Sequence, residues 1–372
     1  MRGRRWSVLI ASVWLCAACA GPSTNVPALA PDDVDAERRK QETAQLRDYY
    51  AQLHRLDTVA FRLRTANRDD CKEWVSAQIG LYAATPQNLP RKYRSFAAEA
   101  LNLTSVRPTV ISVVDGSPAA AAGIVTGDEI TAFNGEPVPV TETSGWIGGF
   151  LRRNGEQPVQ VALRRGDVEQ TLELKPVMGC AIPITLETNP VPNAATDTKK
   201  IVIQSGLLRM LRTDADLATI VCHELAHVNM GHYGKKLQNA LLGGLGGALV
   251  DGAFGLATMN TGGTFTRHFF QAGAKAFSVA FEREADYVGA YYATRAGYDI
   301  SGAEDVWRAM ALEDPASIHT AKTHPTTPER FLFLQKVTAE IADKKRRNVA
   351  LVPELKMIQA DAAPAATRDG NY

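Results

Sequence analysis

The sequence predicts an α+β protein in which a β-rich module precedes a mainly helical domain. Residues 101–178 alternate β-branched runs with glycine, proline and asparagine turn signals, whereas the chain follows a helical pattern from Ser205 onward. The 372 residues suffice for two folded units with flanking segments. A formal net charge of +1 gives no argument for a nucleic-acid partner.

The first twenty residues have the pattern of a secretory signal peptide. Residues 1–6 contain three arginines, and the apolar run 7–18 is too short to span a bilayer. We therefore expect the chain to be exported. Residues 21–31, rich in proline, serine, threonine and asparagine, are expected to form a flexible tether.

Two routes of processing stay open. Ala17-Ala18-Cys19 resembles a bacterial lipobox, although Cys16 stands where an aliphatic residue is usual. Lipidation at Cys19 would anchor the protein to the outer membrane, because Ala20 and not aspartate follows the cysteine. Ordinary cleavage after Ala20 would instead leave a soluble periplasmic protein. We favour the lipoprotein, because the tether suits a lipid-anchored start.

Three cysteines lie beyond both processing sites, in a compartment that permits disulfides. Cys71 and Cys180 bracket the β-rich module, so we expect a bridge that closes it. Cys222 lies in an apolar helical pattern, where a buried free thiol is expected.

Residues 32–68 are rich in charge and in helix formers. Their apolar positions recur three and four residues apart, which predicts one long amphipathic helix packed along the protein or a partner. The positions are Leu46, Tyr49, Leu53, Leu56, Ala60 and Leu63. A coiled-coil dimer stays open as an alternative. We expect residues 32–100 to form a helical N-terminal region.

The β-rich module begins with a predicted strand at residues 109–114. Ser117 is expected to cap a short helix, with Pro118 in its first turn and Gly123 at its end. The further expected elements are a tight turn at Asn134-Gly135, a helix at 143–152 and a hairpin formed by 159–163 and 168–174.

This module resembles a PDZ domain of the bacterial protease-associated type. The resemblance is carried by Gly116-Ser117-Pro118-Ala119, Ala122-Gly123-Ile124, Gly127-Asp128-Glu129-Ile130 and Asn134-Gly135. It implies a groove, between the strand at 109–114 and the helix at 143–152, that takes an extended peptide by β-augmentation. Trp146 and Phe150 are candidate pocket walls, with core packing as the alternative. No carboxylate-binding loop is recognised in residues 101–108.

The candidate catalytic centre lies in a predicted helix at residues 213–231. His223 and His227 are four residues apart and share a helical face, from which both imidazoles can reach one metal ion. Glu224 is close enough to hold the metal's water and to take its proton during attack on a peptide carbonyl. The structural alternative is a pair of core histidines beside a buried ion-pair glutamate.

A second helical pattern at residues 281–286 supplies carboxylates. Glu282 completes a two-histidine, one-carboxylate zinc set that leaves a position open for water and substrate. Asp286, one turn later, is expected to accept the free N–H of a ligand histidine. Glu284 is expected to face solvent or a salt bridge. His232 is interpreted as a structural or a surface residue, because metzincin spacing requires a histidine where Tyr233 stands.

Together these residues resemble the HtpX / CaaX-prenyl-protease family of gluzincin-type endopeptidases. The resemblance rests on Asn193-Ala194, Leu217-Ala218, residues 223–227, Glu282-x-x-Ala285-Asp286, Thr323-His324-Pro325 and Arg330. It implies a mainly helical zincin-type metallopeptidase domain with a small edge sheet at residues 184–345, and one Zn²⁺ per chain.

The same resemblance implies a role for each matched residue. His223, His227 and Glu282 are zinc ligands, Glu224 is the general base, and Asp286 supports a ligand from behind. His324 either stabilises the oxyanion, approaches the zinc as a reversible extra ligand, or only stabilises its loop. Arg330 is expected to stabilise the same loop region by pairing with a carboxylate. Substrate is expected to lie on the strand near Asn193.

The segment 240–257 is apolar, but it is rich in glycine and interrupted by Asp251, so it is not expected to span a membrane. A buried or lid-forming helical hairpin over the cleft is expected instead. This favours the soluble periplasmic, BepA-like members of the family. Residues 346–372 are expected to form a C-terminal tail.

We therefore predict a zinc-dependent endopeptidase of the bacterial cell envelope. Its substrates are expected to be extended segments of misfolded or unassembled proteins, captured by the PDZ groove, with membrane contact through a lipid anchor only. The alternative is a periplasmic chaperone or assembly factor with a latent zinc site, since the glycine-rich segment and His324 are placed to close the cleft. The oligomeric state stays open.

Overall fold

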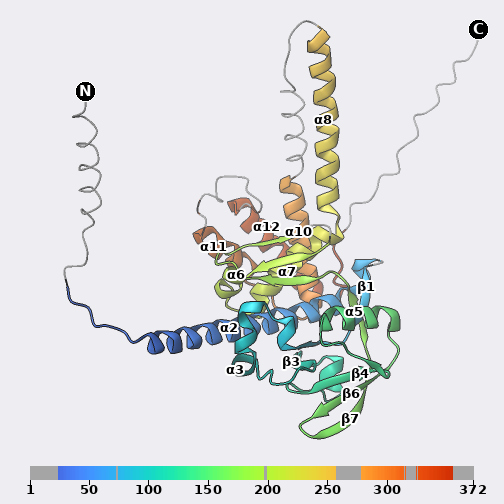
Figure 1. Cartoon of the computed structure of the whole chain (residues 1–372). Coiled ribbons are helices and arrows are strands. Elements are labelled where there is room, and N and C mark those ends of the chain that lie inside the picture. Colours follow the sequence, from blue (N-terminus) through green and yellow to red (C-terminus); the bar gives the residue numbers. More distant parts are fainter. Residues whose placement is uncertain are drawn as a thin grey trace, which may run out of the picture.

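The computed structural model describes residues 24–72, 74–196, 199–256, 278–313, 315, 324 and 326–354. A β-rich module comes first and a mainly helical domain follows, so the expected α+β class is confirmed. Figure 1 shows the two parts packed against one long helix, α2. The expected signal peptide with Cys19 and the chain beyond residue 354 lie outside the described residues.

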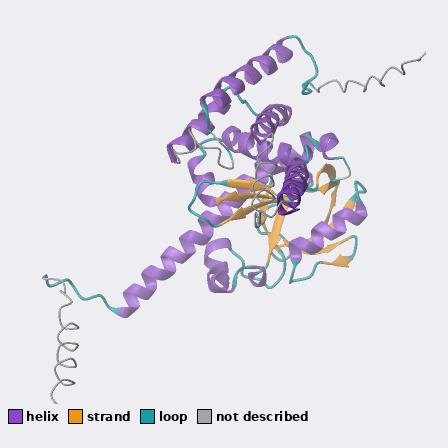
Figure 2. Ribbon diagram, turned by 90° about the horizontal axis from the view of Figure 1, so that it is seen from above, coloured by secondary structure: helices purple, strands orange, loops and turns teal. Residues whose placement is uncertain are grey.

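Helix α2 (Pro31–Ala66) belongs to both parts of the protein. Proline in its first turn, followed by Asp32 and Asp33, favours a helix start at this point. Leu56, Val59 and Leu63 are fully buried in the core of the helical domain. Leu46 is buried in a separate cluster with residues of α3 (Ala97–Leu101). The N-terminal turns of α2 are exposed and extend away from the body (Figure 2).

The β-rich module is built on an antiparallel sheet of strand order β2-β3-β4-β6-β7. Its strands are β2 (Leu81–Ala84), β3 (Thr109–Val113), β4 (Glu129–Phe133), β6 (Val159–Arg165) and β7 (Val168–Leu174), with β5 (Glu136–Pro137) beside β4. The short helix α4 (Pro118–Ala121) begins where Ser117 Oγ accepts a hydrogen bond from the N–H of Ala120. Helix α5 (Thr143–Asn154) packs against β1 and β2 and, through Phe150 and Ile147, covers the core.

Two expectations for this region are wrong. Residues 32–100 are not helical throughout, because they contain β1 (Val75–Gln78) and β2, beside the 3₁₀ turns η1 (Arg68–Cys71), η2 (Pro86–Asn88) and η3 (Arg91–Phe96). Strand β1 pairs with β8 (Val177–Cys180), and β2 pairs with β3. The groove strand is therefore not at 109–114, since β3 lies inside the sheet between β2 and β4 and has no edge to offer a peptide.

A disulfide joins Cys71 to Cys180 beside the β1–β8 ribbon. Cys222 is a buried free cysteine in α7, and burial raises the pKa of its thiol. Trp146 stacks on Phe150, and both contact Phe133, so these two aromatic residues belong to the core of the module.

The helical domain begins with a small sheet of strand order β10-β11-β9. Its strands are β9 (Ile184–Glu187), β10 (Ala194–Thr196) and β11 (Ile201–Gln204). Its helices are α6 (Ser205–Met210), α7 (Asp214–Asn229), α8 (His232–Leu256), α10 (Ser278–Arg295), α11 (Ala303–Glu313) and α12 (Pro328–Arg346). Strand β11 is central and β10 forms an edge, antiparallel to it.

Helix α7 forms the centre of the domain. A capping box starts it, in which Thr213 accepts from the N–H of Asp216 and the Asp216 carboxylate accepts from the N–H of Thr213. Helix α10 packs closely against it at Gly289. A Cβ at position 289 would lie 2.9 Å from the backbone nitrogen of His223, so the two helix backbones meet here without an intervening side chain.

Helix α8 differs from the expected hairpin over the cleft. It is one continuous helix from His232 to Leu256 that projects from the body (Figure 1), and residues 257–277 lie outside the described residues. Leu237, Leu241 and Leu245 are exposed on it. Among the described helices, none has an apolar stretch long enough to cross a membrane.

Candidate active site

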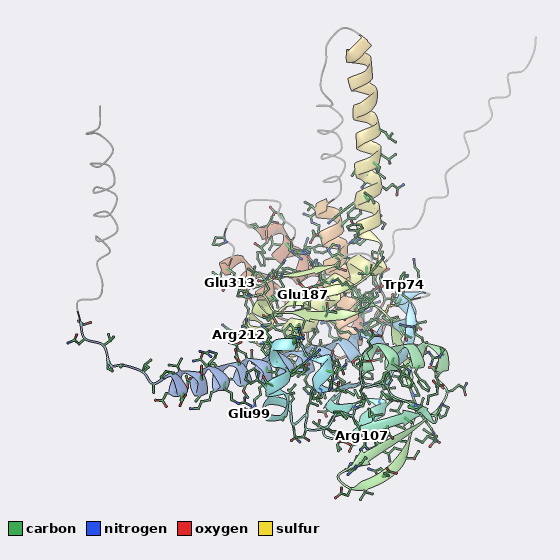
Figure 3. All side chains as sticks on the ribbon, viewed as in Figure 1. Trp74, Glu99, Arg107, Glu187, Arg212 and Glu313 are labelled. Carbon is green, nitrogen blue, oxygen red and sulfur yellow. A yellow bond between two sulfur atoms is a disulfide. The ribbon has the colours of Figure 1, made fainter. Side chains whose placement is uncertain are left out.

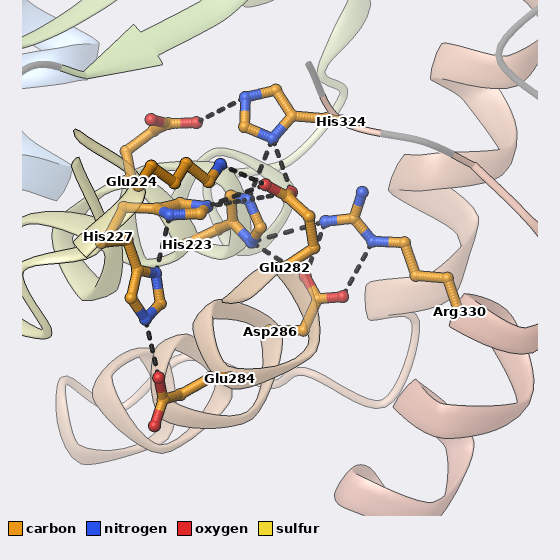
Figure 4. A network of polar contacts seen from close by, with 10 residues as sticks. His223, Glu224, His227, Glu282, Glu284, Asp286, His324 and Arg330 are labelled. Carbon is orange, nitrogen blue, oxygen red and sulfur yellow. Dashed lines mark hydrogen bonds and ion pairs between the residues drawn. The ribbon is translucent and has the colours of Figure 1, made fainter. Parts of the chain in front are cut away.

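The two histidines of α7 direct their Nε2 atoms toward the same point. His223 Nε2 lies 3.1 Å from His227 Nε2, and both side chains are buried (Figure 4). Helix α10 brings Glu282 to the same place, with its Oε2 3.4 Å from His223 Nε2 and its Oε1 3.5 Å from His227 Nε2. Three donor groups that lie far apart in the sequence therefore converge on one point.

These separations fit a tetrahedral zinc site. Zinc–nitrogen bonds of about 2.1 Å at the tetrahedral angle place neighbouring ligand atoms about 3.4 Å apart. The three separations are 3.1, 3.4 and 3.5 Å. Glu282 Oε1 is also buried and accepts no hydrogen bond from the described residues, although the Lys236 ammonium lies 3.6 Å from it, so a cation bound at this point would satisfy the oxygen more fully. The nitrogen and oxygen donors are those that zinc takes in catalytic sites.

His324 lies at a fourth corner of this cluster. Its Nδ1 is 3.2 Å from His223 Nε2 and 2.9 Å from Glu282 Oε2, and its Nε2 is 3.4 Å from Glu224 Oε1. The four groups His223, His227, Glu282 and His324 can contribute ligand atoms that lie within 4.8 Å of one another. Of the three roles considered for His324, this position corresponds to that of an extra ligand.

Asp286 and Arg330 fix the position of His223 on the side of its Nδ1 atom. Asp286 Oδ1 lies 2.8 Å from His223 Nδ1, so the ring's other nitrogen faces Glu282 and His227. Arg330, from α12, donates to both oxygens of Asp286 over 2.8 and 2.7 Å. The guanidinium carbon of Arg330 lies 3.4 Å from the centre of the Trp307 ring. This bidentate, stacked geometry fixes the tautomer and the orientation of His223.

The protonation of these groups follows from their neighbours. Burial lowers the pKa of His223, but its hydrogen bonds to Asp286 and Glu282 outweigh burial and raise that pKa to about 9. Burial lowers the pKa of His227 to about 3, because the bond to Glu282 compensates only in part. Burial raises the pKa of Glu282, yet the surrounding histidines bring it well below its usual range. Glu282 is therefore ionised and His227 neutral, the forms that bind a metal, whereas His223, with its raised pKa, must lose a proton when a metal binds.

A second chain of contacts supports His227, and the sequence did not predict it. His232 Nδ1 lies 2.9 Å from His227 Nδ1, and His232 Nε2 lies 2.8 Å from Glu284 Oε2. His232 is buried, so of its two interpretations, a structural or a surface residue, the structural one holds, and Glu284 forms a salt bridge with it. In the sequence, this contact could have been indicated only by the position of His232, five residues after His227.

Glu224 lies beside the cluster without pointing its carboxylate into the centre of it (Figure 4). Its side chain is buried, and its Oε2 accepts no hydrogen bond from the described residues. A buried carboxylate oxygen without a hydrogen bond, next to the fourth corner, is suited to accept a proton from a polarised water molecule.

A cleft of about 320 Å³ opens onto the cluster. Strand β10 lines it through Ala195 and Thr196. Trp74 (labelled in Figure 3), which is 53% exposed, lines it as well. Lys236, from the base of α8, also lines the cleft and lies 3.6 Å from Glu282 Oε1. The edge strand expected to receive substrate near Asn193 thus borders the metal-binding groups.

Comparisons with known proteins place two domains on the chain. Residues 183–338 match the model of Peptidase family M48, and residues 84–175 match a PDZ domain model. The chain therefore carries a metallopeptidase domain of family M48 preceded by a PDZ domain. The PDZ match begins at residue 84, whereas the predicted module began at residue 101.

Two curated relatives match the peptidase region. The chain is 24% identical over 177 residues to the mitochondrial metalloendopeptidase OMA1 of Schizosaccharomyces pombe, covering 46% of this chain and 51% of that protein. It is 30% identical over 162 residues to the mitochondrial metalloendopeptidase OMA1 of Arabidopsis thaliana, covering 42% and 31% respectively. The matched part thus spans about half and about a third of these relatives.

A solved structure of the HtrA3 PDZ domain bound to a phage-derived ligand is also similar, at 25% identity over 28% of this chain and 88% of that chain. Its TM-score of 0.22 gives no basis for an argument about function.

Proposed function

We propose that this protein is a zinc-dependent endopeptidase that hydrolyses peptide bonds within extended polypeptides. The observation that carries the proposal is the convergence of His223, His227 and Glu282 at tetrahedral spacing, with the Glu224 carboxylate beside them. The curated relatives are metalloendopeptidases by name, which supports the same reaction class.

In the proposed mechanism His223, His227 and Glu282 hold the ion. Zinc bound there would act as a Lewis acid that lowers the pKa of a water molecule and polarises the substrate carbonyl. Glu224 orients that water and accepts its proton at Oε2, the oxygen without a hydrogen bond in the described residues. The same carboxyl group then gives the proton to the leaving amine.

Substrate orientation comes from the edge of the small sheet. Strand β10 ends its sheet on the cleft side, so an extended polypeptide can pair with it through main-chain hydrogen bonds. This pairing would present a scissile bond to Glu224 and to the metal-binding groups. Because β10 contributes only backbone groups to such pairing, we expect broad sequence tolerance.

We further propose that the substrates are misfolded or unassembled proteins of the bacterial cell envelope. The basis is the signal-like sequence at residues 1–20, with Cys19 as the proposed lipidation site and the outer membrane as the proposed address. The PDZ domain would capture an extended segment at β2, the end strand of its sheet, beside α5.

The test is cleavage of β-casein by the purified chain, with and without a zinc chelator, followed by mass spectrometry of the products. We expect internal fragments that disappear on chelation and return when zinc is added. Release of single amino acids from one end would refute an endopeptidase. Cleavage that survives complete removal of metal would refute zinc dependence.

A second candidate function is a chaperone or assembly factor with a latent site. The observation that favours it is His324, which occupies the fourth corner that substrate and water would need. If a Glu224→Gln strain matches the wild type in assembling its envelope proteins while a deletion strain does not, this second function is correct.

A further inference from the structure

Part of the wall of the active-site cleft comes from a segment outside both matched domains. Asp70, Cys71, Lys72 and Trp74, which we call the rim, line the cleft beside the metal-binding groups. The PDZ match begins at residue 84 and the peptidase match at residue 183, so the rim belongs to neither domain. Selectivity that arises from the rim is therefore not a general property of these two domains.

The backbone of the rim is fixed by covalent and polar contacts. The disulfide joins Cys71 to Cys180 of β8, and Asn229, the last residue of α7, donates to Cys71 Sγ over 3.5 Å. The N–H of Trp74 donates to the carbonyl of Cys71 over 2.8 Å, and the carbonyl of Trp74 accepts from the N–H of Ala181 over 2.7 Å. These contacts hold Trp74 at a defined place relative to the catalytic helix.

Lys72, between the disulfide and Trp74, has an unfavourable backbone conformation. Its φ is 50° and its ψ is −124°, a combination that a residue with a Cβ rarely adopts. Asp70 pairs with Arg295 of α10, and Cys71 is fixed by the disulfide, so contacts on the preceding residues maintain this conformation. Backbone strain of this kind is concentrated at functional sites, which directs attention to what the rim carries into the cleft.

The rim carries an indole ring whose surface is open. Trp74 is 53% exposed although its backbone is fixed, and its ring makes no ring contact and no hydrogen bond with another described residue. Tyr233, from the first turn of α8, lines the same cleft and is 55% exposed. Tryptophan and tyrosine offer a large, rigid apolar surface for binding. The cleft therefore contains aromatic surface that the described part of the protein does not cover.

The position of this surface indicates a side chain of the substrate as its occupant. Ala195 and Thr196 of β10 line the same cleft, so a polypeptide paired with β10 runs past the rim. An extended polypeptide directs alternate side chains to opposite faces, and every second one can reach a wall of the cleft. Because the side chains of Ala195 and Thr196 are small, β10 itself discriminates little between substrate side chains.

The charges of the cleft favour an apolar occupant. An aromatic ring can bind either an apolar side chain or a cation. Lys72 and Lys236 also line the cleft, and their ammonium groups repel a lysine or arginine side chain. Asp70, the acidic residue of the rim, is already paired with Arg295. A large uncharged side chain therefore fits the surface best.

We propose that Trp74, together with Tyr233, selects substrates that carry a large apolar side chain close to the scissile bond. That side chain packs on the indole ring while the main chain of the substrate pairs with β10. The inference rests on the proposed endopeptidase function and names part of its sequence preference. It adds selectivity at one substrate position to the broad tolerance expected from β10.

The test compares three pools of fluorescein-labelled decapeptides whose two ends are blocked. One central position holds phenylalanine, leucine or methionine in the first pool, alanine in the second and lysine in the third, and small uncharged residues fill the other positions. Cleavage is measured as kcat/KM with the wild type. Binding is measured by fluorescence polarisation with the Glu224→Gln protein, which keeps the metal ligands. Binding at the PDZ groove is common to all variants of the rim, so a change on substitution of Trp74 reports on the cleft.

Trp74→Ala and Trp74→Phe are introduced into both proteins. The matched control is Leu332→Ala, since Leu332 of α12 is a large apolar residue that is 62% exposed and does not line the cleft. Zinc content verifies that each variant keeps an intact metal site. Trp74→Phe keeps an aromatic ring at the position and should therefore preserve most of the preference.

We expect the apolar pool to be cleaved and bound about tenfold better than the alanine pool, because a large apolar side chain leaves water on the indole ring. Trp74→Ala should reduce this ratio to within about twofold, and Leu332→Ala should leave it unchanged. Equal treatment of the two pools by the parent proteins, an unchanged ratio in Trp74→Ala, or a preference for the lysine pool would overturn the proposal. Selective binding by Glu224→Gln without any cleavage by the wild type would refute the endopeptidase function and leave the subsite standing.

Discussion

The contact between α7 and α10 gives a sharp prediction at Gly289. A Cβ at this position would lie 2.9 Å from the backbone nitrogen of His223 and 3.0 Å from the carbonyl carbon of Cys222. Ordinary van der Waals contact begins at 3.4 Å, so Gly289→Ala must move the helices apart by about 0.5 Å. Metal sites tolerate ligand displacements of about 0.2 Å. Glu282 on α10 would therefore leave the reach of a metal held by the two histidines of α7.

The expected result is at least a tenfold weaker zinc affinity for Gly289→Ala, measured by competition with a chromogenic chelator. Overpacking should also lower stability by about 1–3 kcal/mol, against a gain of about 1 kcal/mol from replacing a helical glycine. The matched control is Gly145→Ala in α5, where a Cβ meets nothing within 4 Å. A folded Gly289→Ala protein that binds zinc within twofold of the wild type would refute the reasoning.

Three further predictions concern the site and the groove. Asp286→Asn should weaken zinc binding about ten- to hundredfold in the same chelator assay, because it no longer holds His223 in one tautomer; an unchanged affinity would contradict this role. His324→Ala should cleave casein faster than the wild type, since the fourth corner is then open; slower cleavage would show instead that His324 assists the reaction. Burial raises the pKa of Asp57 from 3.8 to about 6, so its contribution to stability is present below pH 4 and is lost as pH rises through 6. Asp57→Asn should therefore stabilise the protein by about 3 kcal/mol at pH 7 and hardly at pH 4 in urea unfolding; an equal effect at both pH values would contradict this.

Helix α7 was predictable because the residues that determine it lie close together in the sequence. His223 and His227 are one turn apart, and helical geometry alone puts both imidazoles on one face. The capping box at Thr213 and Asp216 also lies in consecutive residues. Glu282 and Asp286 were assigned from a second helical pattern of carboxylates and from the resemblance to a known family, since nothing local relates them to α7. Their approach depends on Gly289, whose importance appears only once the helices are packed.

The predictions that were wrong concern elements whose contact partners lie far away in the sequence. Strands β1 and β2 have four residues each, and their partners lie at residues 177–180 and 109–113, so no local periodicity identified them. The groove was consequently assigned to an inner strand. Whether His232 is structural or lies on the surface stayed open in the sequence, because Glu284, which fixes its role, lies 52 residues away. The segment of helix α8 was expected to form a buried or lid-forming hairpin, because apolar composition does not show whether a partner covers it.

The most direct test of the central claim is zinc content measured together with casein cleavage, on the wild type and Glu224→Gln purified in parallel. The ligands His223, His227 and Glu282 are intact in this variant, while the proton acceptor is lost. We predict close to one zinc per chain in both proteins and cleavage by the wild type only. A wild type without zinc, or a Glu224→Gln variant that cleaves casein at the wild-type rate, would contradict the account.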